Sequence, residues 1–167
     1  MGTNNRLIIY DTKLPDRFHP QEGDCLFCAD SSVHHCMGCF GCWVKTPGQC
    51  VIKDSASDLP RLITESREVS IISPILYGGF SKNIKSALDR SIGYILPYFR
   101  IIDGEMHHQL RASYSFKLTV CFYGLCGEKE KELAKKLVKA NAVNFGAQSQ
   151  EVFFFDTPEE AAERTAK

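Results

Sequence analysis

The chain has 167 residues, of which 44% are hydrophobic and 24% charged, and its formal net charge is zero. This composition is typical of a globular domain and excludes a disordered chain, and we expect a single domain over residues 1–167. No basic patch predicts nucleic-acid binding, and no apolar run approaches the ~20 residues that cross a bilayer. The polar start and the short apolar run after it do not match a signal peptide, so we expect a cytoplasmic protein.

The first third of the chain predicts two strands and little helix. Residues 6–10 (RLIIY) and 24–29 (DCLFCA) each read as a short buried strand. Residues 12–23 between them contain two prolines and a glycine and cannot form a long helix. A cysteine-rich loop follows, and residues 57–66 predict a helix.

The middle of the chain predicts a central strand and a long amphipathic helix. Residues 68–75 (EVSIISPI) are β-branched and almost continuously apolar, as in a buried parallel strand. Ser81 is a suitable N-cap for a helix whose apolar side chains recur on one face as far as Leu96, where Pro97 ends it. A longer connection then leads to about residue 113.

The last third predicts strand, helix, strand and helix in that order. Residues 114–123 and 150–155 read as strands, and residues 128–144 as a helix between them. Thr157 as N-cap and Pro158 at the first helical position predict a terminal helix.

Strands that alternate with helices predict an α/β fold with a parallel sheet. We expect a flavodoxin-like doubly wound parallel five-stranded sheet of order 2-1-3-4-5, with the first helix missing or reduced. Ligands of such sheets bind beyond the carboxyl ends of the strands. This places residues 11–14, 73–80 and 123–127 around one crevice, and we expect the cysteine loop beside it.

Six of the eight cysteines lie between residues 25 and 50, which favours metal or redox chemistry over a framework of disulfides. The run C-M-G-C-F-G-C supplies Cys36, Cys39 and Cys42, and Cys50 follows. Its two glycines allow the tight curl that turns several thiolates toward one point. An iron–sulfur cluster suits this compact spacing better than zinc does, and reduced thiols or a disulfide stay open. Cys25 and Cys28 lie on a strand, where their side chains diverge.

Residues 36–90 resemble the flavodoxin-like NAD(P)H-dependent FMN reductases, and especially the branch that includes iron–sulfur flavoproteins. The segments that carry the resemblance are CMGCFGCWVKTPGQCVIKD and SPILYGGFSKNIKSALDR. The resemblance implies that Cys36, Cys39, Cys42 and Cys50 hold a [4Fe–4S] cluster near FMN. It further implies an oxidoreductase or electron-transfer flavoprotein that takes electrons from NAD(P)H and passes them to a small-molecule or protein acceptor.

The same resemblance implies a flavin site on the loop after the central strand. An aromatic side chain there lies against the isoalloxazine ring, while loop amides approach its polar edge. The cofactor-binding residues implied in this chain are Thr12, Ser73, Pro74, Ile75, Leu76, Tyr77, Gly78, Gly79, Phe80, Tyr123 and Gly124. No catalytic side chain is implied, because the flavin supplies the chemistry.

The chain departs from the family after its first strand. Family members have a Ser/Thr- and Gly-rich loop and a helix that hold the FMN phosphate, whereas this chain reads Asp11-Thr12-Lys13-Leu14-Pro15-Asp16-Arg17. This departure supports an alternative, a degenerate flavodoxin-like module without flavin that acts as a metal or redox sensor or as an interaction protein. We also expect the lost helix to leave an apolar sheet face uncovered, which predicts a homo-oligomer.

Polar side chains outside these motifs give weaker signals. The histidine pairs at 34–35 and 107–108 are candidate ligands or proton donors, but adjacent loop histidines are usually just exposed. Lys85 and Asp89 have the spacing of an ion pair on a helix face. Cys121 on its strand reads as a small buried hydrophobe.

Overall fold

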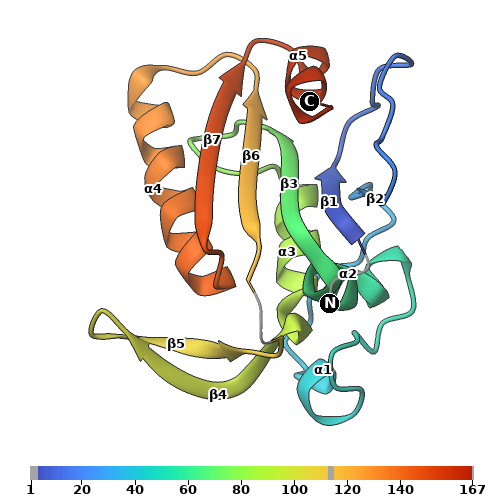
Figure 1. Cartoon of the computed structure of the whole chain (residues 1–167), viewed down its shortest axis with the longest axis vertical. Coiled ribbons are helices and arrows are strands. Elements are labelled where there is room, and N and C mark those ends of the chain that lie inside the picture. The colour runs from blue at the N-terminus through green and yellow to red at the C-terminus, as the bar shows by residue number, and fades with distance from the viewer. Residues whose placement is uncertain (1–3, 113–114, 167) are drawn as a thin grey trace.

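The computed structural model describes residues 4–112 and 115–166, and Figure 1 shows their arrangement around one central sheet. Five parallel strands lie in the order β2-β1-β3-β6-β7. Their bounds are β1 Asn4–Tyr10, β2 Asp24–Cys28, β3 Ser66–Pro74, β6 Lys117–Tyr123 and β7 Ser149–Phe155. The predicted flavodoxin-like order is confirmed, and within the described residues no helix lies between β1 and β2.

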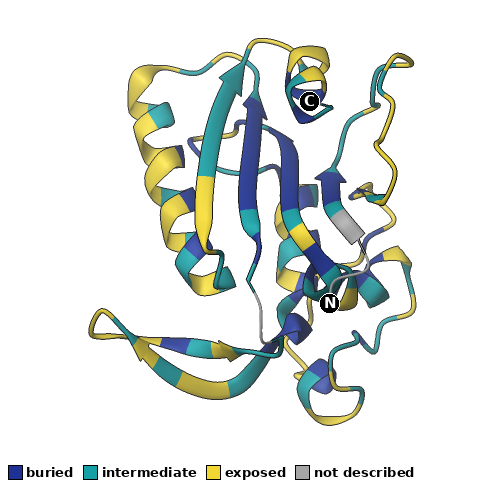
Figure 2. Cartoon of the chain, in the orientation of Figure 1, coloured by how far each residue is buried: buried dark blue, intermediate teal, exposed yellow. Residues whose placement is uncertain are grey.

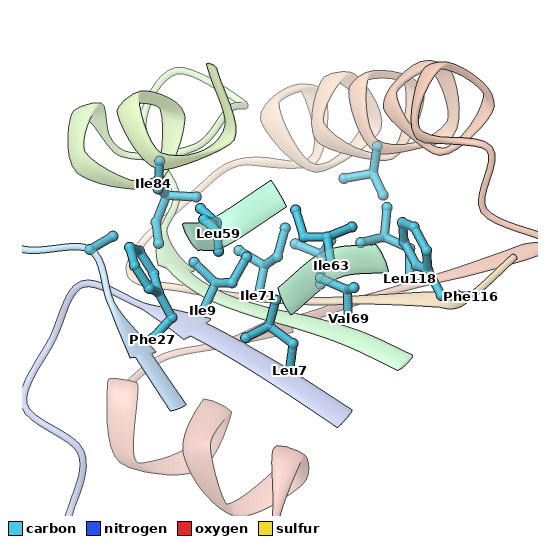
Figure 3. Packing of buried hydrophobic residues seen from close by; sticks show 14 of the residues in the cluster. Leu7, Ile9, Phe27, Leu59, Ile63, Val69, Ile71, Ile84, Phe116 and Leu118 are labelled. Atoms are coloured by element: carbon cyan, nitrogen blue, oxygen red, sulfur yellow. The ribbon is translucent and has the colours of Figure 1, made fainter. Parts of the chain in front are cut away.

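Helices cover one face of the sheet along its whole length. These are α2 Leu59–Glu65, α3 Lys82–Arg90 and α4 Glu128–Phe145, while the short α1 Gly41–Val44 lies in the cysteine loop. Buried side chains of β1 and β3, such as Leu7 and Val69, pack here against Ile63 of α2 and Ile84 of α3 (Figure 3). This face holds the larger of the two apolar clusters.

The second face carries one helix, α5 Pro158–Thr165, which begins with the predicted Thr157 cap. Ala161 and Ala162 of α5 pack with Ile8, Ile72 and Cys121 in a smaller buried cluster. Cys121 is thus the buried hydrophobe that its strand position predicts. Leu14 and Phe18, from the segment that takes the place of a first helix, pack on the same cluster. Helix and loop together cover the apolar half of this face.

The rest of the second face is polar, so the predicted uncovered apolar surface is wrong. A shallow cavity of about 280 Å³ lies there, and it is lined by Arg6, Asp24, Glu68, Ser70, Lys117, Thr119 and Glu151 among others. Some of these groups pair with one another, as Lys117 does with Glu151 and Arg6 with Asp24, each with 2.6 Å between nitrogen and oxygen. The missing helix therefore uncovers charged side chains and gives no ground for self-association through this face.

The predicted long helix that ends at Leu96 is also wrong, because α3 ends at Arg90. A short 3-10 turn, Ile92–Tyr94, follows it, and the chain then enters a hairpin of β4 Ile95–Ile102 and β5 Glu105–Leu110. The hairpin turn consists of Asp103 and Gly104, which both have positive φ, 50° and 85°. Two-residue turns of this type join antiparallel strands whose twist they match. The expected long connection is therefore a two-stranded sheet (Figure 1).

Other element boundaries lie close to the predictions. A 3-10 turn, Ser55–Asp58, precedes α2. The strand predicted from residue 114 begins at Lys117 in the structure, and Tyr114 itself lies outside the described residues. No helix in the described ranges is both long enough and apolar enough for a membrane span. Figure 2 shows a continuous run of buried residues in each of β3 and β6 at the centre of the sheet, whereas most residues of the hairpin are exposed or partly buried.

Candidate functional site

The four motif cysteines line one cavity of about 560 Å³. The walls come from the cysteine loop, the last turn of α3, the β4–β5 hairpin and the last turn of α4. The lining includes Cys36, Cys39, Cys42, Cys50, Leu88, Arg90, Tyr94, His107, His108, Asn144 and Phe145. The four cysteines of the motif therefore border one space, their role as ligands stays a prediction, and the rest of the wall is mostly apolar.

Tight local backbone brings the cysteines together. Gly38 and Phe40 both adopt left-handed conformations, with φ of 63° and 53°, so the chain curls sharply between successive cysteines. Gly41 has no such conformation, but a Cβ at its position would lie 2.6 Å from Cγ1 of Val51. The two glycines of the motif thus serve different purposes. Gly38 permits a conformation, and Gly41 permits close packing of the loop on the segment after Cys50.

The four thiols differ in exposure and interact electrostatically. Cys42 and Cys50 are buried, while Cys36 and Cys39 are exposed. Burial raises the pKa of the Cys42 thiol, and the negative charges of Cys50, Cys36 and Cys39 raise it further. Charges act on one another in this way only when they are close. Within the described ranges, no three His, Cys, Asp or Glu side chains are positioned to hold one metal ion.

A buried arginine stands directly behind Cys50. Arg90 is 1% exposed, and its Nε donates a hydrogen bond to the Cys50 sulfur at 3.1 Å. The same guanidinium forms a double hydrogen bond with Asp54, with both nitrogen–oxygen distances 2.7 Å. These bonds hold the pKa of Asp54 below its ordinary value. Arg90 ends the SPILYGGFSKNIKSALDR segment, and nothing in the spacing of that segment indicates a contact with Cys50.

The hairpin wall of the cavity carries two histidines, and the expectation that they are merely exposed is wrong. His107 is buried, with Nδ1 at 3.1 Å from Oδ1 of Asn144. His108 is partly buried and lies against the rings of Trp43 and Phe99. The earlier pair, by contrast, is exposed, although His35 Nδ1 lies 2.8 Å from the Ser86 hydroxyl.

The loop predicted to hold flavin lies at the opposite end of α3. In this loop Leu76 and Gly79 exchange two backbone hydrogen bonds, which closes a turn with Tyr77 and Gly78 at its tip. Tyr77 is 93% exposed, and Gly78 packs so closely on α4 that a Cβ there would lie 2.9 Å from Leu133. The aromatic side chain is therefore free to contact a ligand, while the backbone of the turn is fixed against α4.

The other predicted flavin residues surround the same edge of the sheet. Ile75 donates its amide to the carbonyl of Tyr123, and Gly124 donates to Phe155. The Ser73 hydroxyl accepts from the amide of Ser81, which caps α3. Pro74 and Phe80 flank the turn, and Thr12 hydrogen-bonds with Tyr123. The structure thus brings the predicted residues together at the carboxyl ends of β1, β3 and β6.

A carboxylate also lies at this edge, close to the place after β1 where the resemblance implies a phosphate site. Asp11 accepts a hydrogen bond from the hydroxyl of Ser81, the N-cap of α3. Its Oδ1 atom is buried and has no hydrogen-bond partner among the described residues. Burial raises the pKa of Asp11, although its hydrogen bonds work in the other direction. The amino end of α3 therefore already faces an anion that belongs to the chain.

The prediction that the cysteine loop lies beside the flavin crevice is wrong. Ser81 begins α3 at the flavin loop, and Arg90 ends it at the cysteine cavity. With nine residues in α3, these ends are about 14 Å apart. A groove between α3 and α4 joins the two sites, because it reaches from Gly79 and Phe80 to Leu88 and Phe145 of the cavity wall.

Two smaller predictions concern residues outside both sites. Lys85 and Asp89 form the expected ion pair on α3, with 2.8 Å between nitrogen and oxygen. Cys25 packs against the apolar core, whereas Cys28 on the same strand is exposed. The side chains of this second cysteine pair therefore diverge as predicted.

Comparison with known proteins relates part of the chain to iron–sulfur flavoproteins. The chain is 33% identical over 66 residues to an iron–sulfur flavoprotein of Archaeoglobus fulgidus. These residues make up 40% of this chain and 29% of that protein. It is 33% identical over 63 residues to an iron–sulfur flavoprotein of Methanocaldococcus jannaschii, covering 38% of this chain and 32% of the other. The match thus spans about a third of the relatives' length. No protein-family model matches the chain.

Solved structures share the fold over almost the whole chain. An FMN-dependent NADH-azoreductase from Bacillus anthracis, in complex with FMN, superimposes with a TM-score of 0.54 at 14% identity, covering 98% of this chain and 100% of that one. An NAD(P)H:quinone oxidoreductase from Methanothermobacter marburgensis gives a TM-score of 0.57 at 12% identity, covering 98% and 95%. The resemblance that the motifs predicted, to flavodoxin-like FMN reductases and iron–sulfur flavoproteins, is confirmed.

Proposed function

We propose that this protein is an electron-transfer flavoprotein of the NAD(P)H-dependent FMN reductase type, and that Cys36, Cys39, Cys42 and Cys50 hold a [4Fe–4S] cluster. The observation that carries the proposal is the convergence of these four cysteines on one cavity, with a buried arginine at one of the sulfurs. The partial sequence match to iron–sulfur flavoproteins supports the same cofactor.

Four cysteine thiols line one space, and thiolates are the ligands of iron–sulfur clusters. Within the described residues, no three His, Cys, Asp or Glu side chains are placed to hold a single metal ion. Cluster ligands are thiolates, and the N–H donor and positive charge of Arg90 stabilise negative charge on Cys50. When bound, the cluster supplies one-electron transfer, and the apolar wall of hairpin and α4 limits the access of water.

The flavin site fits only in part. The loops after β3 and β6 expose Leu76, Tyr77 and Leu125 at the carboxyl edge, and the ring of Tyr77 is free to lie against an isoalloxazine ring. The phosphate has no comparable site, since Asp11 occupies the amino end of α3 and no glycine-rich loop follows β1. Nearby basic residues are already paired, Lys13 with Asp16 and Arg17 with Glu163. The chain therefore offers a ring surface without a phosphate cradle.

Anaerobic reconstitution with iron and sulfide tests the cluster. We expect the wild type to gain broad visible absorbance and about four irons per chain. Cys42→Ser removes a proposed ligand and is expected to lose both signals, whereas Cys126→Ser, which changes a cysteine outside the motif, is expected to keep them. Reconstitution that does not distinguish these two variants would refute the assignment.

The poor phosphate site favours a second candidate function, a degenerate flavodoxin-like module that holds a cluster or metal without flavin and serves as a redox sensor or interaction protein. Titration of the reconstituted protein with FMN, followed by addition of NADH or NADPH, separates the two. FMN retention with oxidation of the pyridine nucleotide supports the reductase. A cluster without flavin retention supports the sensor.

The proposal also covers the location, the partners and the oligomeric state of the protein. We propose a single cytoplasmic domain that reacts with a small-molecule or protein electron acceptor and binds neither nucleic acid nor membrane. The proposed homo-oligomer needs a contact surface other than the polar sheet face. The hairpin provides exposed apolar side chains for it, among them Tyr98, Phe99 and Ile101, and size-exclusion chromatography with light scattering tests the assembly.

A further inference from the structure

Arg90 uses all of its hydrogen-bonding capacity around the cysteine loop. A guanidinium has five N–H donors. In Arg90 one donor reaches the Cys50 sulfur and two reach Asp54. The remaining two reach the backbone carbonyls of His34, at 2.9 Å, and Ile52, at 3.2 Å. A buried charge is tolerated when it is paired and fully hydrogen-bonded, and this one is.

These bonds join both ends of the cysteine loop to α3. His34 precedes the first motif cysteine. Cys50 is the last motif cysteine, and Ile52 and Asp54 follow it. Asp54 strengthens the connection, because its carboxylate also accepts from the amide of His34 at 3.0 Å. The arginine is thus placed to do two things, to hold the loop in position and to keep a positive charge against one sulfur.

The burial of the pair makes that charge effective. The Arg90 side chain is 0% exposed and that of Asp54 is 10% exposed, so water screens them little. Asp54 and Cys50 bind different nitrogens of the guanidinium. The carboxylate of Asp54 accepts hydrogen bonds from the two terminal nitrogens, whereas Nε donates to the sulfur of Cys50. Its negative charge therefore opposes the effect of the arginine on the sulfur without removing the N–H contact.

We propose that Arg90 is a positioning residue that raises the reduction potential of the cluster bound at Cys50, and that Asp54 lowers it. This inference rests on the proposed cluster. Reduction adds one electron to the cluster and breaks no bond, so the reduced state carries one more negative charge. A positive charge and an N–H donor at a ligand sulfur stabilise that state, and hydrogen bonds to sulfur and net charge are known determinants of cluster potential.

Potentiometric titration of the reconstituted protein tests the inference. The oxidised cluster is reduced stepwise with dithionite in the presence of mediators, and visible absorbance and electron paramagnetic resonance follow it. We expect Arg90→Gln to shift the midpoint potential downward and Asp54→Asn to shift it upward. Arg90→Lys retains the charge without the Nε–H contact, so its potential is expected between those of the wild type and Arg90→Gln.

The matched control is Arg61→Gln. Arg61 also pairs with two carboxylates, those of Asp58 and Glu65, but it is half exposed and does not line the cysteine cavity. Its removal is expected to leave the potential unchanged. A purely structural role for Arg90 predicts lower cluster occupancy in both the arginine and the aspartate variants, but no shift in opposite directions.

The outcomes separate this inference from the function on which it rests. A wild type that binds no cluster overturns both. A wild type that binds a cluster, with equal potentials in Asp54→Asn and wild type or with shifts of the same sign in both variants, overturns the inference alone. If Arg90→Gln does not fold, as circular dichroism reports, Arg90→Lys and Asp54→Asn still decide, because their expected shifts are opposite.

Discussion

Replacement of Gly41 by alanine tests how closely the cysteine loop is packed. The new Cβ would lie 2.6 Å from Cγ1 of Val51 and 3.4 Å from its Cγ2. Carbon atoms in contact prefer separations of about 3.5–4.0 Å, so the valine must move by roughly 1 Å. Its branched side chain has few alternative rotamers. Overpacking of this kind costs about 1–3 kcal/mol, and we expect Gly41→Ala to reduce the free energy of unfolding by that amount.

The assay is urea unfolding of the reduced, metal-free protein, read as a change in midpoint at constant slope. In thermal unfolding the same loss lowers the melting temperature by about 2–4 °C per kcal/mol for a chain of this size. A double-mutant cycle identifies the cause. Because Val51→Ala removes the clashing Cγ1 methyl group, we expect it to cancel about 1 kcal/mol or more of the cost of Gly41→Ala.

Gly38→Ala is the matched control for this cycle. Gly38 has a φ of 63°, yet a Cβ there would have no atom within 4 Å. Its replacement meets only the penalty of the left-handed conformation, about 1–2 kcal/mol, and Val51→Ala is not expected to relieve it. Wild-type stability in Gly41→Ala, or equal relief of both glycine variants by Val51→Ala, would refute the packing argument.

Three further predictions concern other parts of the chain. Thr157→Ala removes the cap whose hydroxyl accepts from the Glu160 amide at 3.3 Å, and we expect it to cost about 1 kcal/mol in urea unfolding; no change would show that α5 does not depend on its cap. Asp11→Asn removes the anion at the amino end of α3, so FMN affinity is expected to rise about three- to tenfold in fluorescence titrations, while riboflavin, which lacks the phosphate, gains less; equal gains would contradict a phosphate effect. Because Arg90 depresses the pKa of Asp54, this carboxylate stabilises the fold above its unfolded-state pKa, and the contribution is lost as pH falls through the lower folded-state value. Asp54→Asn is therefore expected to cost about 1–3 kcal/mol at pH 7 and progressively less below about pH 4, and a constant difference across that range would contradict the ion-pair argument.

Much of the fold was predictable because the sheet is simple. Each central strand is a short, almost continuously apolar run, and strands that alternate with helices leave few arrangements for a parallel sheet. The cap at Thr157 and the ion pair of Lys85 and Asp89 were also predictable, since both depend on side chains three or four residues apart.

The hairpin was missed although its signal was present. The spacing of isoleucine and leucine residues after Arg90 suits a helix face, but the same residues are also typical of strands. Asp103-Gly104 directly after this run indicates a two-residue hairpin turn, and this local signal decides between the two interpretations. The error mattered for the site, because the hairpin supplies His107 and His108 to the cavity wall.

The location of the cysteine site depends on contacts that sequence spacing does not contain. The motif singled out four cysteines that line one cavity, but the end of the sheet where this cavity lies is determined by the partners of the loop on α3, above all Arg90. The uncovered sheet face shows the same limit. The missing helix was evident from residues 12–23, whereas its replacement by α5 and a polar surface required the tertiary structure.

The most direct test of the account is anomalous diffraction at the iron edge from crystals of the anaerobically reconstituted protein. The account predicts one compact group of iron atoms in the cavity, bonded to the sulfurs of Cys36, Cys39, Cys42 and Cys50, with Arg90 against the last. Iron absent from the cavity, or bound there by side chains other than these four, would contradict it.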